Sequence, residues 1–258
     1  GVFFTVALKD NGTVWAWGWN VSGQLGDGTT TNRLTPMQVG GLSEVTAIAA
    51  GGRYTVALKN DGTVWAWGSN FEGQLGDGTT TDRTAPVQVG ALSDVIAIAA
   101  GFGHTVALKS DGTVWVWGAN SYGQSGNGTT SVSTAPAQVI GLSDVAAIAA
   151  GSYHTIALKN DGSVWAWGAN AVYQLGDGTS TVRLTPTPVN DLSNVTGIAG
   201  GYIHSAAFKN DGTAWAWGNN YYGQLGNGTT TTPMTPMQVS ELSKVTAIAA
   251  GTNHTIAL

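Results

Sequence analysis

Residues 51–100 read GGRYTVALKNDGTVWAWGSNFEGQLGDGTTTDRTAPVQVGALSDVIAIAA, and this 50-residue stretch recurs along the chain. Copies begin at Gly1, Gly51, Gly101, Gly151 and Gly201, in register and without insertion or deletion. Residues 251–258 start a sixth copy. A fixed period of this length is typical of solenoids, propellers and arrays, in which each copy is one supersecondary unit. The repeats at 1–50, 51–100, 101–150, 151–200, 201–250 and the partial 251–258 therefore predict one repeat domain.

Composition excludes several classes of protein. The 258 residues are 42% hydrophobic, enough for a sizeable core. The formal net charge is −5 and no basic run occurs, so the electrostatic signature of nucleic-acid binding is missing. The chain has no cysteine, which excludes disulfides and thiolate metal sites. No apolar stretch reaches the roughly 20 residues of a spanning helix, so we expect no membrane insertion.

A β-hairpin opens each copy. In the second copy, residues 55–59 alternate polar and apolar side chains, and residues 64–68 form the returning strand. Asp61-Gly62 joins them, and an Asp-Gly turn between alternating runs is a strong hairpin signal. Because side chains alternate across a strand, Trp65 and Trp67 lie on one face. We expect these tryptophans to form core between copies rather than a platform for sugars.

Two further strands complete the copy. After an irregular loop at residues 70–81, rich in Gly and Thr, residues 86–89 form a short strand whose proline suits a sheet edge. Residues 95–100 read as a buried strand of small and branched side chains. Four short strands per copy and no helix predict an all-β protein, a β-propeller of four-stranded blades.

Three runs in each copy carry a family resemblance: H-T-V-A-L, D-G-T-V-W-A-W-G-x-N and G-Q-L-G-D-G. At this period they resemble bacterial-type repeats of the regulator of chromosome condensation (RCC1) family, and the resemblance covers the whole chain. It implies a β-propeller, typically with seven blades. Low charge with abundant Gly, Thr, Asn and Trp also favours an extracellular or cell-surface bacterial module.

The number of blades stays open. Either five blades close a ring, with residues 245–250 supplying the strand missing beside residues 1–39, or the chain is an arc of a larger, seven-bladed propeller. In a closed ring residues 251–258 would duplicate residues 1–8, which favours the arc. Because the chain starts with Gly and stops inside a copy, we expect a processed or excised piece of a longer protein. An incomplete ring would leave self-association open.

Two segments of each copy are predicted to emerge at the same end of a blade. The strand order places residues 51–54 and 70–81 together, on what we call the loop face. Residues 60–62 and 92–94 lie on the opposite face. The copies barely differ on the opposite face and differ sharply on the loop face. Variable loops on a fixed scaffold usually carry binding.

The variable positions of the loop face are rich in aromatic side chains. Tyr, Trp and Arg are enriched at the centres of protein interfaces, and exposed apolar patches mark binding surfaces. We predict that these rings anchor a partner while Arg53 and Glu72 tune its orientation. The candidate partner-binding residues are Phe3, Trp19, Arg53, Phe71, Glu72, Phe102, Tyr122, Tyr153, Tyr202, Tyr221 and Tyr222. The alternative is that several of these rings pack between neighbouring blades.

One column of histidines is interpreted as structural. It comprises His104, His154, His204 and His254. Phe4 and Tyr54 occupy the same position in the first two copies, and neither a metal site nor a catalytic site would tolerate that replacement. We expect each histidine to be hydrogen-bonded near the start of its strand. No paired carboxylates and no nucleophile with a base stand outside the repeat pattern, so we predict no enzyme activity, no cofactor and no metal.

A second column alternates Asp with Asn. It comprises Asp27, Asp77, Asn127, Asp177 and Asn227. Calcium needs several clustered oxygen ligands, and one interchangeable side chain per loop provides too few. We interpret these residues as turn residues that adopt positive φ beside glycine. The constant glutamines Gln24, Gln74, Gln124, Gln174 and Gln224 are expected to satisfy backbone groups of their own loops.

Protein recognition through the loop face is the predicted function. Two other classes are a glycan-binding, lectin-like propeller and a structural or assembly unit. A repeated lectin would keep its site residues the same in every copy, whereas here they differ, as one continuous epitope would require. The founding member of the family is a nucleotide-exchange factor for a small GTPase that docks on chromatin. A secreted bacterial inhibitor of β-lactamases, similar in fold, grips its target with this face. We transfer neither role to this chain, because its acidic charge is unlike that of the founding member and its repeats are longer than those of the inhibitor.

Overall fold

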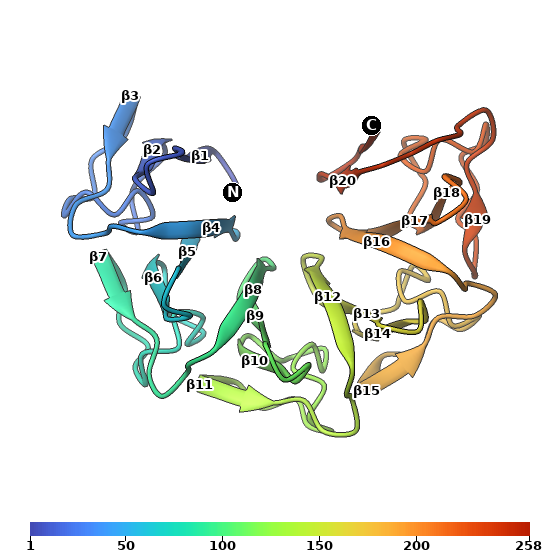
Figure 1. Ribbon diagram of the computed structural model, residues 1–258, viewed down its shortest axis with the longest axis horizontal. Coiled ribbons are helices and arrows are strands. Elements are labelled where there is room, and N and C mark those ends of the chain that lie inside the picture. The colour runs from blue at the N-terminus through green and yellow to red at the C-terminus, as the bar shows by residue number, and fades with distance from the viewer. The chain divides into compact units, whose positions relative to one another are not determined.

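The computed structural model describes residues 1–258 and consists of β-strands joined by turns and loops (Figure 1). It contains no helix that is long and apolar enough to cross a membrane. The chain forms two compact units. Unit 1 comprises residues 1–120 and 131–138, and unit 2 comprises residues 121–130 and 139–258.

Unit 1 contains three antiparallel sheets. The first is three-stranded, with β1 (Phe4–Leu8), β2 (Val14–Gly18) and β3 (Arg33–Gln38). The second is four-stranded, with β4 (Val45–Ala50), β5 (Tyr54–Lys59), β6 (Val64–Gly68) and β7 (Arg83–Gln88). The third has β8 (Val95–Ala100), β9 (His104–Lys109), β10 (Val114–Gly118) and β11 (Ser133–Gln138). In each four-stranded sheet the last strand of one copy pairs with the first strand of the next.

Unit 2 continues the pattern. One sheet contains β12 (Val145–Ala150), β13 (His154–Lys159), β14 (Val164–Gly168) and β15 (Arg183–Pro188). The next contains β16 (Val195–Gly200), β17 (His204–Lys209), β18 (Ala214–Gly218) and β19 (Met237–Gln238). β20 (Ile248–Ala250) and β21 (Thr255–Ala257) begin a further sheet. The predicted class is confirmed: repeated antiparallel blades, five of them plus a partial one, without helices.

The hairpin predicted at the start of each copy is present. β5 and β6 pair from Tyr54 opposite Gly68 to Leu58 opposite Val64. Gly62 adopts a φ of 77°, which favours glycine. Asp61 Oδ1 accepts hydrogen bonds from the N–H and the hydroxyl of Thr63 at 3.0 and 2.6 Å. An aspartate that closes its own turn in this way explains why D-G-T recurs.

The third strand is longer than predicted in the first four copies, whereas in the fifth copy it shortens to Met237–Gln238. We expected residues 86–89, whereas β7 begins at Arg83 and ends at Gln88. The extra residues pair with Gly68 beyond a β-bulge between Ala66 and Gly68. A bulge interrupts the alternation of side chains, so the polar residues before the proline look like loop in the sequence. Pro86 lies on a sheet edge, as predicted, because β7 is the outermost strand.

The strand directions bring the two variable segments together, as predicted. The N–H of Ser69 donates to the carbonyl of Arg53 at 2.9 Å, and the N–H of Trp19 donates to the carbonyl of Phe3 at 2.9 Å. At the other end of the second sheet, the N–H of Asn60 donates to the carbonyl of Glu44 at 2.9 Å. The loop face and the opposite face are therefore two distinct ends of each blade.

One tryptophan of each hairpin joins its copy to the preceding one. Trp67 is fully buried, and its indole N–H donates to the main-chain carbonyl of Gln24 at 3.0 Å. The ring packs on Gly26, where a Cβ would lie 2.6 Å from the ring nitrogen. The equivalent bonds join Trp117 to Gln74, Trp167 to Gln124 and Trp217 to Gln174, at 3.0, 2.8 and 2.9 Å. The prediction that the paired tryptophans form core between copies is confirmed for this one of each pair in the second to fifth copies.

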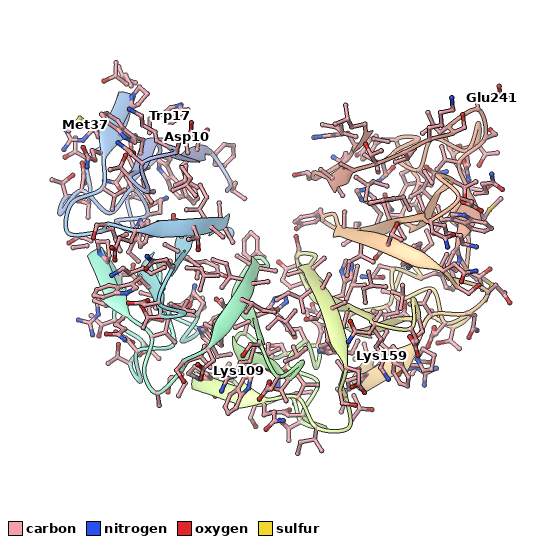
Figure 2. All side chains as sticks on the ribbon, in the orientation of Figure 1. Asp10, Trp17, Met37, Lys109, Lys159 and Glu241 are labelled. Atoms are coloured by element: carbon pink, nitrogen blue, oxygen red, sulfur yellow. The ribbon has the colours of Figure 1, made fainter.

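The second tryptophan of each pair lies closer to solvent. The ammonium groups of Lys109 and Lys159 lie 5.8 and 5.9 Å from the ring centroids of Trp115 and Trp165, both half-buried (Figure 2). These lysines end β9 and β13. A cation over an indole face is stabilising, and the lysine stem covers apolar surface. This contact gives the recurring lysine a structural role.

Three of the four histidines of the column are buried, as expected of structural residues, whereas His254 is exposed. His104, His154 and His204 are fully buried, and Nε2 of His154 lies 3.0 Å from the Ser205 hydroxyl. A Cβ on Gly151 would lie 2.0 Å from the His154 ring and a Cβ on Gly201 would lie 2.1 Å from the His204 ring, so glycine is required beneath these two rings. Burial lowers the pKa of His104 to about 4. The imidazole is therefore neutral at neutral pH and packs as a ring.

Substituting His104 by tyrosine, the residue at this position in the second copy, tests that arrangement. An unfolded histidine has a pKa of about 6.5, whereas burial lowers the pKa of His104 to about 4. The unfolded chain therefore binds the proton first, and stability is lost as the pH falls from about 6.5 towards 4. Between pH 7 and pH 5, the free energy of unfolding of His104→Tyr is expected to fall by on the order of 2 kcal/mol less than that of the native chain. Urea denaturation at both pH values measures this, and equal losses in the two proteins would contradict it.

Two glycines with the same backbone angle separate the effect of the indole from the effect of the backbone. Gly176 and Gly226 have φ of 68° and 67°. A Cβ on Gly176 would lie 2.8 Å from Trp217 Nε1, whereas on Gly226 the nearest atom is Val239 Cγ1 at 3.3 Å. Alanine at positive φ costs about 1–2 kcal/mol at either site. Gly176→Ala should lose a further 1–3 kcal/mol or so through overpacking. Thermal unfolding of the matched pair checks this, and indistinguishable midpoints would disprove it.

Candidate functional site

Each long loop of the loop face is held by its own constant side chains. Gln74 Oε1 accepts the N–H of Glu72 at 2.9 Å, and the equivalent bond forms in all five copies. Asn70 Oδ1 accepts the N–H of Leu75 at 3.0 Å, and its amide donates to the carbonyl of Thr79 at 3.0 Å. The role expected for the glutamines is confirmed. Constant residues therefore satisfy most of the loop backbone, and in the first two copies the variable Asn32 and Asp82 side chains add one bond each, to the N–H of Asn20 and Asn70.

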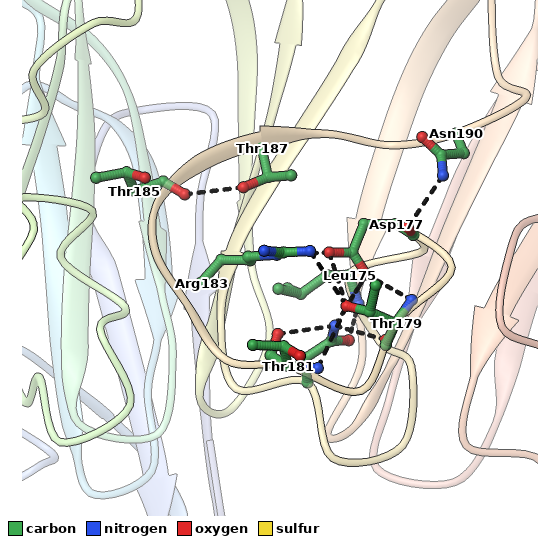
Figure 3. A network of polar contacts seen from close by, with 9 residues as sticks. Leu175, Asp177, Thr179, Thr181, Arg183, Thr185, Thr187 and Asn190 are labelled. Carbon is green, nitrogen blue, oxygen red and sulfur yellow. Dashed lines mark hydrogen bonds and ion pairs between the residues drawn. The ribbon is translucent and has the colours of Figure 1, made fainter.

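An ion pair explains the alternation of Asp with Asn. Asp177 Oδ2 accepts from Arg183 Nε at 2.6 Å, and Oδ1 accepts from the N–H of Thr179 at 3.0 Å and from the amide of Asn170 at 3.0 Å (Figure 3). The same ion pair joins Asp27 to Arg33 and Asp77 to Arg83. Where a copy has Asn127 or Asn227, the partner position holds Ser133 or Pro233.

The interpretation of this column as turn residues at positive φ is wrong. Gly26 and Gly28 adopt φ of 70° and 80°, while Asp27 between them does not adopt a positive φ. The aspartate is an acceptor for arginine instead. Burial alone would raise the pKa of Asp177, but the hydrogen bonds from Arg183 and Thr179 outweigh it and hold the pKa below its ordinary value. The signal in the sequence is that Asp occurs only in copies with Arg six residues later.

In unit 1 an aromatic group gathers around Trp19. The rings of Phe3 and Trp19 meet edge to face with centroids 6.2 Å apart, and the Arg53 guanidinium lies 4.8 Å from the Trp19 centroid. Phe3 is 79% exposed and adopts a φ of 65°. A bulky residue at positive φ is uncommon and strained. This strained backbone presents an aromatic ring to solvent.

Glu72 and Phe71 form a second feature of unit 1. A Cβ on Gly103 would lie 2.3 Å from Glu72 Oε2, so the carboxylate occupies the space beside the glycine. Burial raises the pKa of Glu72. Phe71 is 74% exposed, and Phe102 is partly exposed beside Gly103. The half-buried carboxylate of Glu72 therefore lies next to Phe71 in the sequence. It contacts Gly103, which follows Phe102.

In unit 2 three tyrosines from successive copies form a row. The ring centroids of Tyr122 and Tyr153 are 5.5 Å apart, and those of Tyr153 and Tyr202 are 6.2 Å apart, both edge to face. Tyr153 is half-buried in the middle, while Tyr122 and Tyr202 are partly exposed. Edge-to-face pairs gain about 0.5–1.5 kcal/mol beyond area burial, so these rings hold one another in place. Tyr221 and Tyr222 are 73% and 75% exposed.

The predicted binding residues thus divide between projecting and packing roles. Trp19 and Tyr153 pack between copies, whereas Phe3, Phe71 and the remaining tyrosines project. Sequence reasoning missed that a variable residue of one copy contacts a variable residue of the next, as Glu72 contacts Gly103. Complementary size is the signal, because the large side chain at 72 faces the glycine at 103. No group of three or more His, Asp or Glu side chains is arranged to hold a metal ion.

A family model described as the RCC1-like domain matches residues 1–258. The chain belongs to the RCC1-like domain family. This confirms the resemblance inferred from the repeated runs. No curated protein matches the chain.

Solved structures place the RCC1-like domain among propellers of human and yeast proteins. Human WBSCR16 is similar with a TM-score of 0.89 and 26% identity, over 100% of this chain and 70% of that one. Prp20p from Saccharomyces cerevisiae, described with its binding properties to Gsp1p and histones, has a TM-score of 0.86 and 25% identity, over 98% and 66%. Yeast RCC1 (Prp20) bound to Kap60 has a TM-score of 0.87 and 26% identity, over 100% of this chain and 66% of that one. A bacterial or extracellular origin stays a prediction.

Replacing Asp177 and Arg183 by the residues of the third copy tests how much the ion pair contributes to the stability of the fold. Arg183→Ser leaves Asp177 without its cation and is expected to cost about 1–2 kcal/mol. The double variant Asp177→Asn with Arg183→Ser reproduces the pair found at Asn127 and Ser133 and should cost less than the sum of the single changes. Because the folded pKa of Asp177 is lowered, this contribution is present at neutral pH and is lost as the pH falls below about 4. A urea double-mutant cycle at pH 7 measures the coupling, and strict additivity would refute it.

Proposed function

We propose that residues 1–258 act as one non-catalytic repeat domain that recognises a protein through its loop face. The observation that carries the proposal is the tyrosine row Tyr122, Tyr153 and Tyr202. Three rings held edge to face offer a rigid apolar surface with hydroxyl groups. Tyrosine loses little conformational entropy on binding and is enriched among residues that dominate interface energy.

The relatives support a protein as the partner. Prp20p is described as binding Gsp1p and histones, and yeast RCC1 is seen bound to Kap60. These partners are not transferred, because the chain spans 66% of those proteins and its loop-face residues are its own. Only the class of ligand, a protein, is carried over to the present chain.

The charged residues of the loop face suggest how a partner is oriented. Arg53 rests on Trp19 with its guanidinium edge available, and Arg–carboxylate pairs are directional. Glu72 is half-buried without a cation, so a basic side chain of the partner would be strongly preferred beside it. Within unit 1, a partner that presents one acidic and one basic group fits Arg53 and Glu72.

A glycan is the weaker alternative. Sugars stack on flat aromatic faces, whereas these rings pack edge to face and expose edges as well as faces. The loop-face residues also differ from copy to copy, which suits one asymmetric surface better than several equal sugar sites.

Paired variants test the loop face directly. Tyr122→Ala with Tyr202→Ala removes the two projecting rings of the row and is expected to weaken partner binding at least about tenfold, as loss of an interface hot spot does. Ile140→Ala removes an apolar side chain that is more exposed than either tyrosine and lies near the opposite face, and it should bind as the native chain does. Affinity capture from an extract of the source organism, with each protein immobilised, measures retention.

The outcomes of that capture separate the alternatives. A partner that is retained by the native chain and by Ile140→Ala but lost by the double variant supports the proposal. Retention by all three proteins, or by none, contradicts it. A ligand that is lost when the extract is treated with periodate is a glycan, and assigns the domain to the lectin-like class.

A further inference from the structure

The tyrosine row of unit 2 lies where turns and loops, rather than strands, form the surface. Tyr122 lies between β10 and β11, Tyr153 between β12 and β13, and Tyr202 between β16 and β17. Successive ring centroids are 5.5 and 6.2 Å apart, and both pairs meet edge to face. Tyr122 is 47% exposed and Tyr202 is 37% exposed. The row therefore presents ring faces, ring edges and hydroxyl groups to a partner.

Main-chain groups beside these rings are already paired within the chain. The carbonyl of Tyr153 accepts the N–H of Ala169 at 2.9 Å, and the carbonyl of Tyr202 accepts the N–H of Ser152 at 3.2 Å. A partner strand binds by pairing with free main-chain groups along the edge of a sheet, and the row does not lie on such an edge. The contacts that the row offers to a partner are therefore made by its side chains.

The loop face of unit 2 is almost free of charged groups. It consists of residues 121–130, 151–154, 169–182, 201–204 and 219–232. These segments contain no Lys or Arg and a single carboxylate, Asp177. Arg183 binds that carboxylate through Nε at 2.6 Å. A charged side chain of a partner would lose its hydration over the row and find no opposite charge there. The segment that covers the row is therefore expected to be uncharged.

The tyrosine hydroxyl groups need acceptors in the segment that covers them. The carbonyls of an α-helix are bonded within the helix, so an apolar helix face would bury the hydroxyls without acceptors, which is unfavourable. A polyproline II segment has no internal hydrogen bonds, and its carbonyls are free to accept. Its alternate residues are about 6 Å apart, close to the spacing of the rings. Proline-rich segments also dock on aromatic side chains at low entropic cost, because their conformation is preformed.

We propose that the tyrosine row binds an uncharged, proline-rich segment of the partner in the polyproline II conformation. This binding mode rests on the proposed function and specifies the chemistry of the partner at this site. Prolines pack on the exposed ring surfaces, and the hydroxyls of Tyr122 and Tyr202 donate to carbonyls of the segment. Tyr153 lies between the two and holds both rings edge to face.

Peptides of defined composition test the partner chemistry. Decaproline with an N-terminal fluorophore and a C-terminal amide is the probe, and its anisotropy is expected to show saturable binding to the native chain. A Gly-Ser peptide of equal length should not bind. A peptide with Lys at every second position carries charge on all three edges of the helix and should bind at least about tenfold more weakly. A native chain that does not bind decaproline, or binds either control peptide equally well, would overturn the proposal.

Two double variants separate the hydroxyls from the rings. Tyr122→Phe with Tyr202→Phe keeps both rings and should weaken decaproline binding about two- to tenfold for each hydroxyl removed. Tyr122→Ala with Tyr202→Ala should abolish binding. Both side chains are partly exposed, so the fold is retained, which thermal unfolding checks. Ile140→Ala, near the opposite face, should bind decaproline as the native chain does. Unchanged binding by either double variant contradicts the proposal.

The affinity capture described above distinguishes this proposal from the proposed function. A chain that retains a partner through Tyr122 and Tyr202 but does not bind decaproline recognises a protein by other chemistry, which overturns the polyproline assignment and leaves the proposed function standing. A partner retained equally by the native chain and by the double alanine variant contradicts the proposed function, whatever the peptides do.

Discussion

The hydrogen bond from a buried indole to the main-chain carbonyl of the preceding copy's glutamine is the contact on which the remaining structure depends. In the junction of Trp67 with Gln24, a ring with no exposed surface fills the space over Gly26 and leaves its single donor paired. An unpaired buried donor would cost about 1–3 kcal/mol. One junction therefore explains three constant residues of the repeat: the tryptophan, the glutamine and the glycine.

The constant glutamines also allow the side chains of the loop face to vary. Gln74 bonds the backbone N–H of Glu72 through its side chain while its own carbonyl receives Trp117, so a single residue closes the loop and joins the copies. The loop backbone is bonded mainly by these constant side chains, with one added bond from Asn32 and from Asp82 in the first two copies. The variable side chains are coupled to one another, because Tyr122 contacts Tyr153 and Glu72 contacts Gly103 across copies. Change at one position of the loop face therefore constrains its neighbour in the next copy.

Local pattern was sufficient to predict the hairpins, the two ends of the blade and the buried tryptophans, because each depends on turn residues and alternation within about ten residues. Contacts between distant positions were not predictable in this way. Because the β-bulge at Gly68 interrupts the alternation of side chains, the first half of β7 was not predicted. The ion pair of Asp177 with Arg183 can be predicted only by comparing both positions across the copies. In the fifth copy Phe208 replaces a leucine, and Gly197, where a Cβ would lie 2.1 Å from that ring, makes room for it. Comparison of the copies with one another carries that information, whereas one copy alone does not.

The most direct test of a scaffold with a separate recognition face is site-specific photo-crosslinking. A benzophenone amino acid placed at Tyr122, on the loop face, and in a second protein at Ser110, in the exposed turn of the opposite face, would be irradiated in extract of the source organism. The account predicts a discrete crosslinked protein from position 122 and none from position 110. The same crosslinked protein from both positions, or a product from position 110 alone, would contradict it.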